Sequence, residues 1–285
     1  MTQTPPSDQA PTPSEVQARH AANRAGWNEG ARSYTAQIAE TIAFIQQGQS
    51  NLHPIELRNL GDLRAWCGTA IHLQCASGRD TLSLLNEGVA RVVGLDISDV
   101  HIENARQTSA GLAALGRLVS ADWVRCDVLD APHSLDASAD LVYTGRGALC
   151  WLHDLTAYAQ VVARLLKPGG VYHVLDDHPF SNLYDSEASE LVFRGVSYFD
   201  QWESSIGWPS TYIGDSLGIP VAQQAVKYEA GWNLMDITNA LLGAGLTLEY
   251  LGEHPEPYWN KFPHLRPELQ GKIPLTFSIR ARKAT

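Results

Sequence analysis

Short apolar runs alternate with amphipathic stretches from residue 70 onward. The runs predict strands at 70–75, 91–97, 121–128, 139–145 and 170–177, and the stretches predict helices at 81–88, 99–115 and 155–166. Alternation of this kind is typical of βαβ units, so it predicts an α/β fold, a doubly wound and mostly parallel sheet with helices on both faces. In the segment LLKPGG we expect Lys167 in the last helical turn, Pro168 to end the helix and two glycines to lead into the next strand.

The chain after residue 178 departs from this alternation. Residues 179–230 are rich in aromatic residues, Gly, Ser and Asp, and they predict an insertion that caps a substrate. A predicted helix at about 232–243 and predicted strands at 247–254 and 273–283 follow, which completes seven strands. The loop that joins the last two strands, at 255–272, is far longer than a hairpin needs.

The N-terminal segment at 15–47 predicts helices. Ser14 is a candidate helix cap with Gln17 three residues on, and Gly26 and Gly30 are expected to divide the segment into two helices. The apolar face of these predicted helices is consistent either with a helix packed on the sheet or with a lid at 15–50 that closes over a pocket. Apolar residues recur at helical spacing on that face: Trp27, Tyr34, Ile38, Ile42 and Ile45.

Composition is that of an ordinary globular protein. Of 285 residues 44% are hydrophobic, whereas residues 1–14 include four prolines, so we expect a disordered tail followed by a single domain at 15–285. Acidic residues exceed Lys and Arg by 10 and the basic residues are scattered, so a nucleic-acid partner is not expected. No apolar run is long enough to cross a membrane, the N-terminus does not resemble a signal peptide, and the four cysteines lack CxxC spacing. We therefore expect a cytoplasmic protein with free thiols.

Candidate chemistry lies where the predicted strands end, because open parallel sheets bind ligands at that edge. Small residues follow the first strand and lead into a helix, so a ligand can approach the backbone there. Asp96 ends the second strand, 18 residues beyond Gly78, and its carboxylate can accept hydrogen bonds from ribose hydroxyls. Asp127 follows the third strand, where it could accept a hydrogen bond from an exocyclic amine while its neighbours sandwich a flat base.

This pattern resembles the class I S-adenosylmethionine (SAM)-dependent methyltransferases. IHLQCASG is similar to the glycine-rich turn of the family, Asp96 in VVGLDIS matches its ribose-binding acid, and Asp127 in RCDVLD matches its adenine-contacting acid. LLKPGG and the strand pair TLEYLGEH and PLTFSIRARK also match, so the resemblance covers roughly residues 70–178 and 232–283. It implies a Rossmann-like sheet with an antiparallel last strand and SAM as cofactor, rather than NAD, because GxGxxG is absent from the first turn.

The resemblance implies a set of cofactor-binding residues on the first turn and the strand ends. The acid that the family usually carries near the end of the first strand is His72 here, so the ammonium group of the methionine portion loses a partner, for which the Gly145 carbonyl or Tyr34 could compensate. Gln74 and Ala76 stand where two glycines are usual. The implied cofactor-binding residues are Tyr34, Gln74, Ala76, Ser77, Gly78, Asp96, Ile97, Asp127, Val128 and Gly145.

Methyl transfer requires alignment of nucleophile, methyl group and sulfur, and sometimes removal of a proton. His178 is the first candidate for the base, because it follows the fifth strand and imidazole titrates near neutrality. Asp177 could orient its ring or bind a cationic substrate, and Tyr143 could place an aromatic face near the sulfonium. The predicted substrate contacts are Arg146, Trp151, His254 and Tyr258.

These residues favour a SAM-dependent methyltransferase acting on a small molecule, an amine or another nitrogen nucleophile. With Glu253, Glu256 and Trp259, the long loop could complete an acidic and aromatic pocket, or it could be a surface flap. Two alternatives stay open: a SAM-dependent cyclisation without methyl transfer, and a non-catalytic SAM-binding or regulatory protein. No metal-ligand spacing occurs, so no metal is expected. Besides the small-molecule substrate, a second copy of the chain could bind through the exposed aromatics of the insertion.

Overall fold

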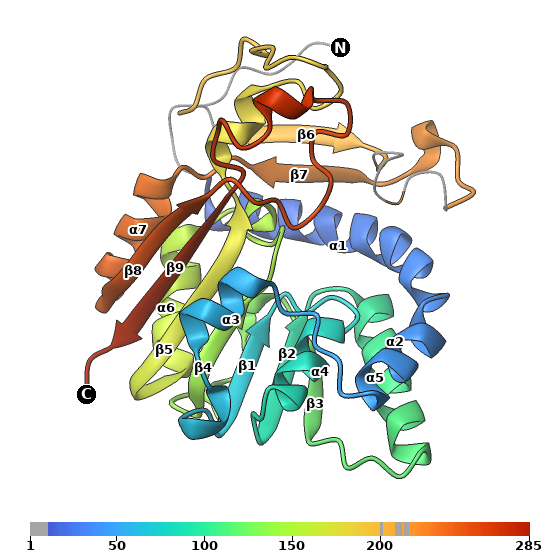
Figure 1. The fold of residues 1–285 in the computed structure, drawn as a ribbon, viewed down its shortest axis with the longest axis vertical. Coiled ribbons are helices and arrows are strands. Elements are labelled where there is room, and N and C mark those ends of the chain that lie inside the picture. Colours follow the sequence, from blue (N-terminus) through green and yellow to red (C-terminus); the bar gives the residue numbers. More distant parts are fainter. Residues whose placement is uncertain (1–10, 200–201, 209–212, 214–216) are drawn as a thin grey trace.

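The computed structural model describes residues 11–199, 202–208, 213 and 217–285 (Figure 1). Most of the predicted tail at 1–14 lies outside these residues. The helices are α1 (Pro13–Thr35), α2 (Ile38–Gln46), α3 (Pro54–Leu60), α4 (Arg79–Asn86), α5 (Asp99–Ala114), α6 (Leu155–Leu165) and α7 (Leu234–Gly243). The strands are β1 (Thr69–Leu73), β2 (Arg91–Asp96), β3 (Ala121–Arg125), β4 (Ala139–Thr144), β5 (Leu166–Asp177), β6 (Trp202–Ile206), β7 (Val226–Ala230), β8 (Leu246–His254) and β9 (Thr276–Lys283).

A seven-stranded sheet in the order β3-β2-β1-β4-β5-β9-β8 forms the centre of the fold. Strands β1 to β5 pair in parallel, and β9 pairs antiparallel to both β5 and β8. The predicted doubly wound sheet with an antiparallel last strand is therefore confirmed. Strand order reverses between β1 and β4, which is where such sheets bind ligands.

Each face of the sheet has its own hydrophobic core, because side chains alternate along a strand. Ile71 and Leu73 of β1 pack with α6 and α7 on one face. Ala70 of the same strand packs on the other face, where α3 and α4 contribute Leu60 and Leu84. Both faces are thus covered, as the continuous apolar runs of the parallel strands predict.

Helix α1 begins and continues differently from the prediction. Thr12, not Ser14, caps it, through a capping box with Glu15, because Pro13 is suited to the first helical position. The helix runs unbroken through Gly26 and Gly30, and the chain breaks only after Thr35. An added Cβ at Gly26 would lie 2.7 Å from Lys227 Cγ, so these glycines serve close packing rather than a helix break.

The start of β5 also differs from the prediction. α6 ends at Leu165, and Lys167 and Pro168 already lie in the strand rather than at the end of a helix. Leu166 is extended, and the Lys167 ammonium donates a hydrogen bond to Asp140 Oδ1 at 2.7 Å, so tertiary contacts favour the strand.

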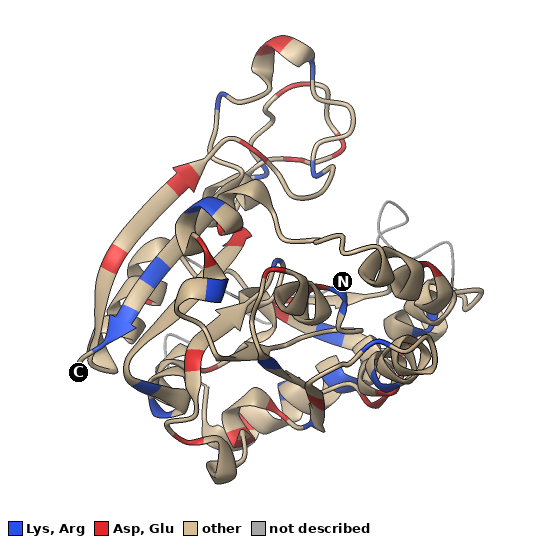
Figure 2. Cartoon of the chain, turned by 60° about the horizontal axis from the view of Figure 1, so that its bottom comes forward, with Lys and Arg blue, Asp and Glu red and all other residues tan. Residues whose placement is uncertain are grey.

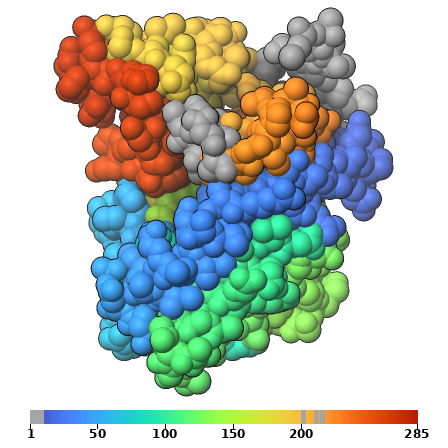
Figure 3. Space-filling model, turned by 90° about the vertical axis from the view of Figure 1, so that its right-hand side faces the viewer, coloured from blue at the N-terminus to red at the C-terminus, as the bar shows by residue number. Residues whose placement is uncertain are grey.

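The predicted insertion contains the antiparallel hairpin of β6 and β7, which the sequence did not reveal. The hairpin lies over the carboxyl ends of the parallel strands, with α1 beneath it (Figure 1). Asn23 of α1 fixes this arrangement, because its side chain accepts a hydrogen bond from Tyr228 N–H at 2.7 Å and donates one to Tyr228 O at 2.8 Å. In Figure 3 the N-terminal helices form a blue band between the orange residues of the insertion and the green residues of α5.

Surface charge and cysteine state agree with the sequence analysis. Lys and Arg are interspersed with Asp and Glu along the chain (Figure 2). All four cysteines are free, as predicted. Among the described residues no helix is long and apolar enough to cross a membrane.

Gly94→Ala is expected to lower the free energy of unfolding by about 1–3 kcal/mol, because there is no room for a methyl group inside the sheet. An added Cβ at Gly94 would lie 2.5 Å from Trp123 Cζ3 and 2.8 Å from Cys75 Sγ. Urea denaturation measures the difference. Gly243→Ala is the control, since its added Cβ meets no atom within 4 Å; equal stability of the two variants would contradict the prediction.

Candidate active site

The carboxyl ends of β1, β2, β4 and β5 border one cavity of about 740 Å³, which residues of α1 and of the β6–β7 hairpin also line. We call it the central cavity. It brings together more than half of the site residues predicted from the sequence. Those that line it are Gln74, Ala76, Asp96, Ile97, Asp127, Val128, Arg146, Trp151, Asp177 and Tyr258.

The turn after β1 has left-handed backbone at Gln74, Ala76 and Gly78, with φ of 57°, 48° and 83°. Such a conformation costs a non-glycine residue about 1–2 kcal/mol, so contacts must hold it. Gln74 Nε2 donates to Ala148 O, and Ala76 N–H donates to Asp96 Oδ2, each at 2.8 Å. The turn therefore keeps the form of a glycine-rich loop although two glycines are missing.

Asp96 ends β2 at the wall of the central cavity. Its carboxylate accepts hydrogen bonds from the backbone N–H groups of Ala76 and Ser98, each at 2.8 Å. Burial raises the pKa of Asp96 to about 6, although these N–H groups act in the opposite direction. A carboxylate has about four acceptor positions, so Asp96 keeps capacity for ligand hydroxyls.

Asp127 is fastened to α1 by His20, a residue that the sequence analysis missed. His20 Nδ1 lies 2.6 Å from Asp127 Oδ2, and His20 Nε2 accepts the backbone N–H of His153 at 3.1 Å. Because Nε2 is the acceptor, Nδ1 carries the proton and donates to the carboxylate. Burial would raise the pKa of Asp127, but the hydrogen bond from His20 outweighs it and holds the pKa below the usual value.

His20→Ala is expected to lower the free energy of unfolding by about 1–3 kcal/mol, because it leaves Asp127 and the His153 N–H without their shared partner. Urea denaturation measures this, and hydrogen exchange of α1 shows whether the loss is local. The control is His133→Ala, whose side chain is 85% exposed and pairs only with groups at the surface. A His20 variant as stable as this control would count against the role of the contact.

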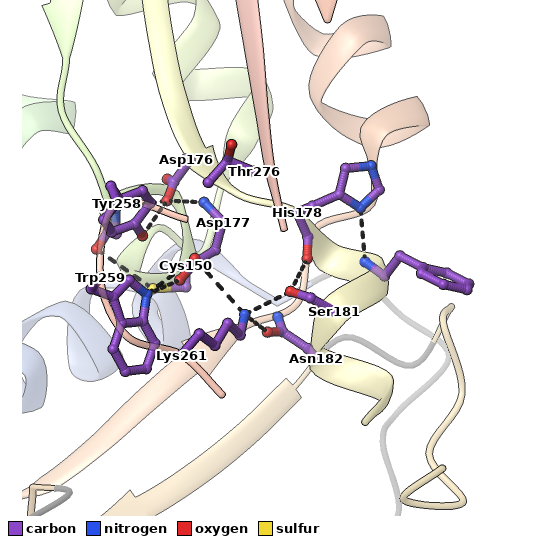
Figure 4. Close-up of polar contacts among 12 residues, drawn as sticks. Cys150, Asp176, Asp177, His178, Ser181, Asn182, Tyr258, Trp259, Lys261 and Thr276 are labelled. Atoms are coloured by element: carbon purple, nitrogen blue, oxygen red, sulfur yellow. Dashed lines mark hydrogen bonds and ion pairs between the residues drawn. The ribbon is translucent and has the colours of Figure 1, made fainter. Parts of the chain in front are cut away.

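Two adjacent carboxylates after β5 have different surroundings. Asp176 accepts the backbone N–H groups of Gly147, Ala148 and Leu149, at 2.7 to 3.1 Å, and so shapes the loop after β4. Asp177 lines the central cavity instead. Figure 4 shows its side chain between the Trp259 indole and the Lys261 ammonium. Trp259 Nε1 donates to it at 3.2 Å, and Lys261 Nζ lies 3.8 Å away.

Three tryptophan rings form the wall opposite the sheet. The ring centroids of Trp27 and Trp208 are 4.6 Å apart, and Trp151 lies 5.3 Å from Trp27 and 5.8 Å from Trp208. Lys227 and Glu229 of β7 complete this wall. The sequence analysis placed them in the insertion without a role, and their spacing of two residues was the only sign that they share one face.

The other predicted site residues do not line the central cavity. His178 turns away from Asp177 (Figure 4). Its Nδ1 accepts the Phe180 N–H and its Nε2 lies 2.8 Å from Glu253 Oε1, so both ring nitrogens are engaged. Tyr143 is fully buried and donates to Glu56 Oε1 at 2.6 Å. Five further predicted site residues also lie outside the lining of the central cavity: Tyr34, Ser77, Gly78, Gly145 and His254.

Comparison with known proteins shows which proteins share this fold. Residues 70–170 match the family model described as a methyltransferase domain. A SAM-dependent methyltransferase of Mesorhizobium loti is 21% identical with a TM-score of 0.56 over 80% of this chain and 96% of its own. A SAM-dependent methyltransferase of Methanosarcina mazei is 15% identical with a TM-score of 0.54 over 82% and 98%. Geranyl diphosphate C-methyltransferase of Streptomyces coelicolor A3(2), solved with S-adenosyl-L-homocysteine, is 14% identical with a TM-score of 0.51 over 81% and 76%. No curated protein matches.

The residues of the central cavity suit SAM. Among the described residues, Gln74 Oε1 and His101 Nε2 are buried and have no hydrogen-bond partner, and both side chains line the cavity. Gln74 Oε1 is an acceptor suited to the ammonium of the methionine portion, whereas Gly145 and Tyr34 lie outside the cavity wall. Burial lowers the pKa of His72 to about 4, so this residue is neutral and does not replace the usual acid.

Asp96 and Asp127 retain acceptor capacity for ribose hydroxyls and an adenine amine. The sheet order, the family match and these acceptors agree. Residues 70–170 therefore match a methyltransferase domain, and the chain shares its fold with solved SAM-dependent methyltransferases.

Proposed function

We propose that this protein transfers the methyl group of SAM to the nitrogen of a small-molecule amine. The observation that carries the proposal is the central cavity itself, in which Asp177, Glu229 and the tryptophan wall share one space with Asp96 and Asp127. A volume of about 740 Å³ is within the range of small-ligand sites. Helix α1 and the insertion would act as the lid and cap of the substrate.

SAM supplies an electrophilic methyl group: the nitrogen lone pair forms the new N–C bond, the C–S bond breaks, and its electron pair stays on sulfur in S-adenosylhomocysteine. The chain has to bind the amine, remove its proton and exclude water. Asp177 is placed to bind an ammonium group and accept its proton. Trp27 and Trp151 also line the cavity, and an aromatic face beside a cation favours it by about 0.5–2 kcal/mol.

His178 and Tyr143 are less suited to these roles. His178 has both ring nitrogens engaged outside the cavity, and Tyr143 is enclosed in the sheet. We therefore assign the role of base to Asp177, and substrate contacts to Trp151 and Tyr258 of the predicted set. Arg146 pairs with Asp80 at 2.7 Å, and we assign to it the role of fixing the loop after β4 instead of a substrate contact.

The test is a methylation assay with radiolabelled SAM against panels of amines, phenols, thiols and carboxylic acids, with S-adenosylhomocysteine quantified alongside. The proposal predicts turnover of one or more amines with one S-adenosylhomocysteine per methylated product. Turnover of phenols or acids alone would overturn the amine assignment. SAM binding without any methylated product would overturn methyl transfer.

A further inference from the structure

The hairpin wall of the central cavity carries a basic and an acidic side chain next to each other. Lys227 and Glu229 are two residues apart on β7, so they project from the same face of the strand, and both line the cavity. In the described part of the chain neither belongs to an ion pair closer than 4 Å. Among the described residues, each charge therefore borders the shared space without a counter-ion in contact.

The ammonium of Lys227 is enclosed, and no carboxylate of the described residues is in contact with it. The residue is 1% exposed, its stem packs on Gly26, and its Nζ lies 4.5 Å from the centroid of the Trp208 ring. Nζ donates to the Gly207 carbonyl, whereas an ammonium has three N–H donors. Burial lowers the pKa of Lys227, against the influence of Glu229 and Glu29. A buried ammonium of this kind is stabilised when an anion pairs with it.

The other charges at this end of the cavity are acidic or already paired. Glu229 lies opposite Glu203 in the hairpin, and burial, followed by that neighbouring charge, raises its pKa. Arg146 is the other cationic side chain of the described cavity wall, and it pairs with Asp80 at 2.7 Å and with Glu56 at 3.8 Å. A ligand anion would therefore meet Lys227, and a ligand cation would meet the acidic side chains.

We propose that the acceptor is a zwitterion, an amine that also carries a carboxylate, as in an amino acid. Lys227 binds the carboxylate, and Asp177 and Glu229 bind the amine that is methylated. This inference rests on the proposed function and narrows its substrate class. It also assigns to the β6–β7 hairpin the selection of the substrate, because Lys227 and Glu229 both come from it.

Matched pairs of compounds that differ only by the carboxylate provide the test: tryptophan and tryptamine, histidine and histamine, phenylalanine and phenethylamine, glycine and methylamine. We expect kcat/KM for the preferred amino acid to exceed that of its amine at least tenfold. In Lys227→Gln, which can still donate to the Gly207 carbonyl, this ratio is expected to fall about tenfold or more, toward one, mainly through a higher KM for the amino acid. The exposed Lys272→Gln is the control and should leave the ratio unchanged.

A structural role of Lys227 alone would change both members of a pair equally, and that result would overturn the inference while the proposed function stands. Preference for the amines would do the same. If no amine is methylated, the proposed function fails. The binding of the amino acid and of its amine then tests whether Lys227 recognises the carboxylate. Melting curves with S-adenosylhomocysteine should show stabilisation by the amino acid but not by its amine, and Lys227→Gln should lose it. Absence of that stabilisation overturns the inference as well.

Discussion

Asp177→Asn is expected to lower kcat by about 100-fold or more and to leave the Kd of SAM within about twofold. Asparagine keeps the size of the side chain and can still accept the Trp259 indole N–H, but it has no negative charge and cannot take a proton from an ammonium. Loss of a positioned general base typically costs between about 10² and 10⁴ in rate. Steady-state kinetics with the preferred amine and calorimetry with SAM measure the two quantities separately.

The neighbouring carboxylate provides the control for this prediction. Asp176→Asn places an amide where backbone N–H groups of Gly147, Ala148 and Leu149 donate, so we expect a loss of stability by about 1–3 kcal/mol. Asp177 accepts no such set of backbone bonds, so Asp177→Asn, which removes the charge 3.8 Å from Lys261, should lose less stability than Asp176→Asn. A stable Asp177→Asn protein with unchanged kcat would exclude Asp177 as the base. Loss of SAM binding in it would assign Asp177 to the cofactor instead.

The sheet could be predicted from the sequence because buried parallel strands are apolar on both faces. Val92, Val93 and Leu95 of β2 are fully or almost fully buried, as a central strand of a parallel sheet requires, and the short apolar run that they form is typical of such a strand. The same reasoning fails for β6 and β7. Their inner face borders the central cavity rather than a core, so inward residues such as Lys227 and Glu229 are charged, and hydrophobicity gives no signal for the hairpin.

For the candidate site, the sequence predicted where the residues lie but not where their side chains point. The cavity lies at the carboxyl ends of the parallel strands, as expected, because the strand ends follow from the predicted strands. The direction of each side chain depends on local bonds: at Asp176, Asp177 and His178 three consecutive residues point to the β4 loop, to the cavity and away from both. Contacts such as His20 with Asp127, 107 residues apart, depend on how α1 packs, which sequence periodicity does not reveal.

Asp96→Asn is expected to weaken SAM binding by about 100-fold at pH 8. An amide offers one acceptor oxygen in place of two, and its NH₂ group faces the backbone donors of Ala76 or Ser98, so fewer acceptors remain for ribose hydroxyls. Calorimetry with S-adenosylhomocysteine, which has the same ribose, measures the change. Asp122→Asn, on the surface and paired with Arg91, is the control and should bind as the wild type does.

The pH dependence of binding distinguishes this role from a purely structural one. The pKa of Asp96 is raised from its usual value of 3.8 to about 6 in the folded protein without cofactor. As pH falls through 6, Asp96 therefore becomes protonated in the free protein, and binding of the cofactor has to compete with this protonation. The cofactor requires the ionised form, so its affinity should decrease below pH 6, by up to about tenfold per pH unit, and level off above it. Asp127 has a lowered pKa and stays ionised over this range. Affinity that is constant from pH 5 to 8, or the same decrease in Asp96→Asn, would show that Asp96 supports the turn after β1 without contacting the ribose.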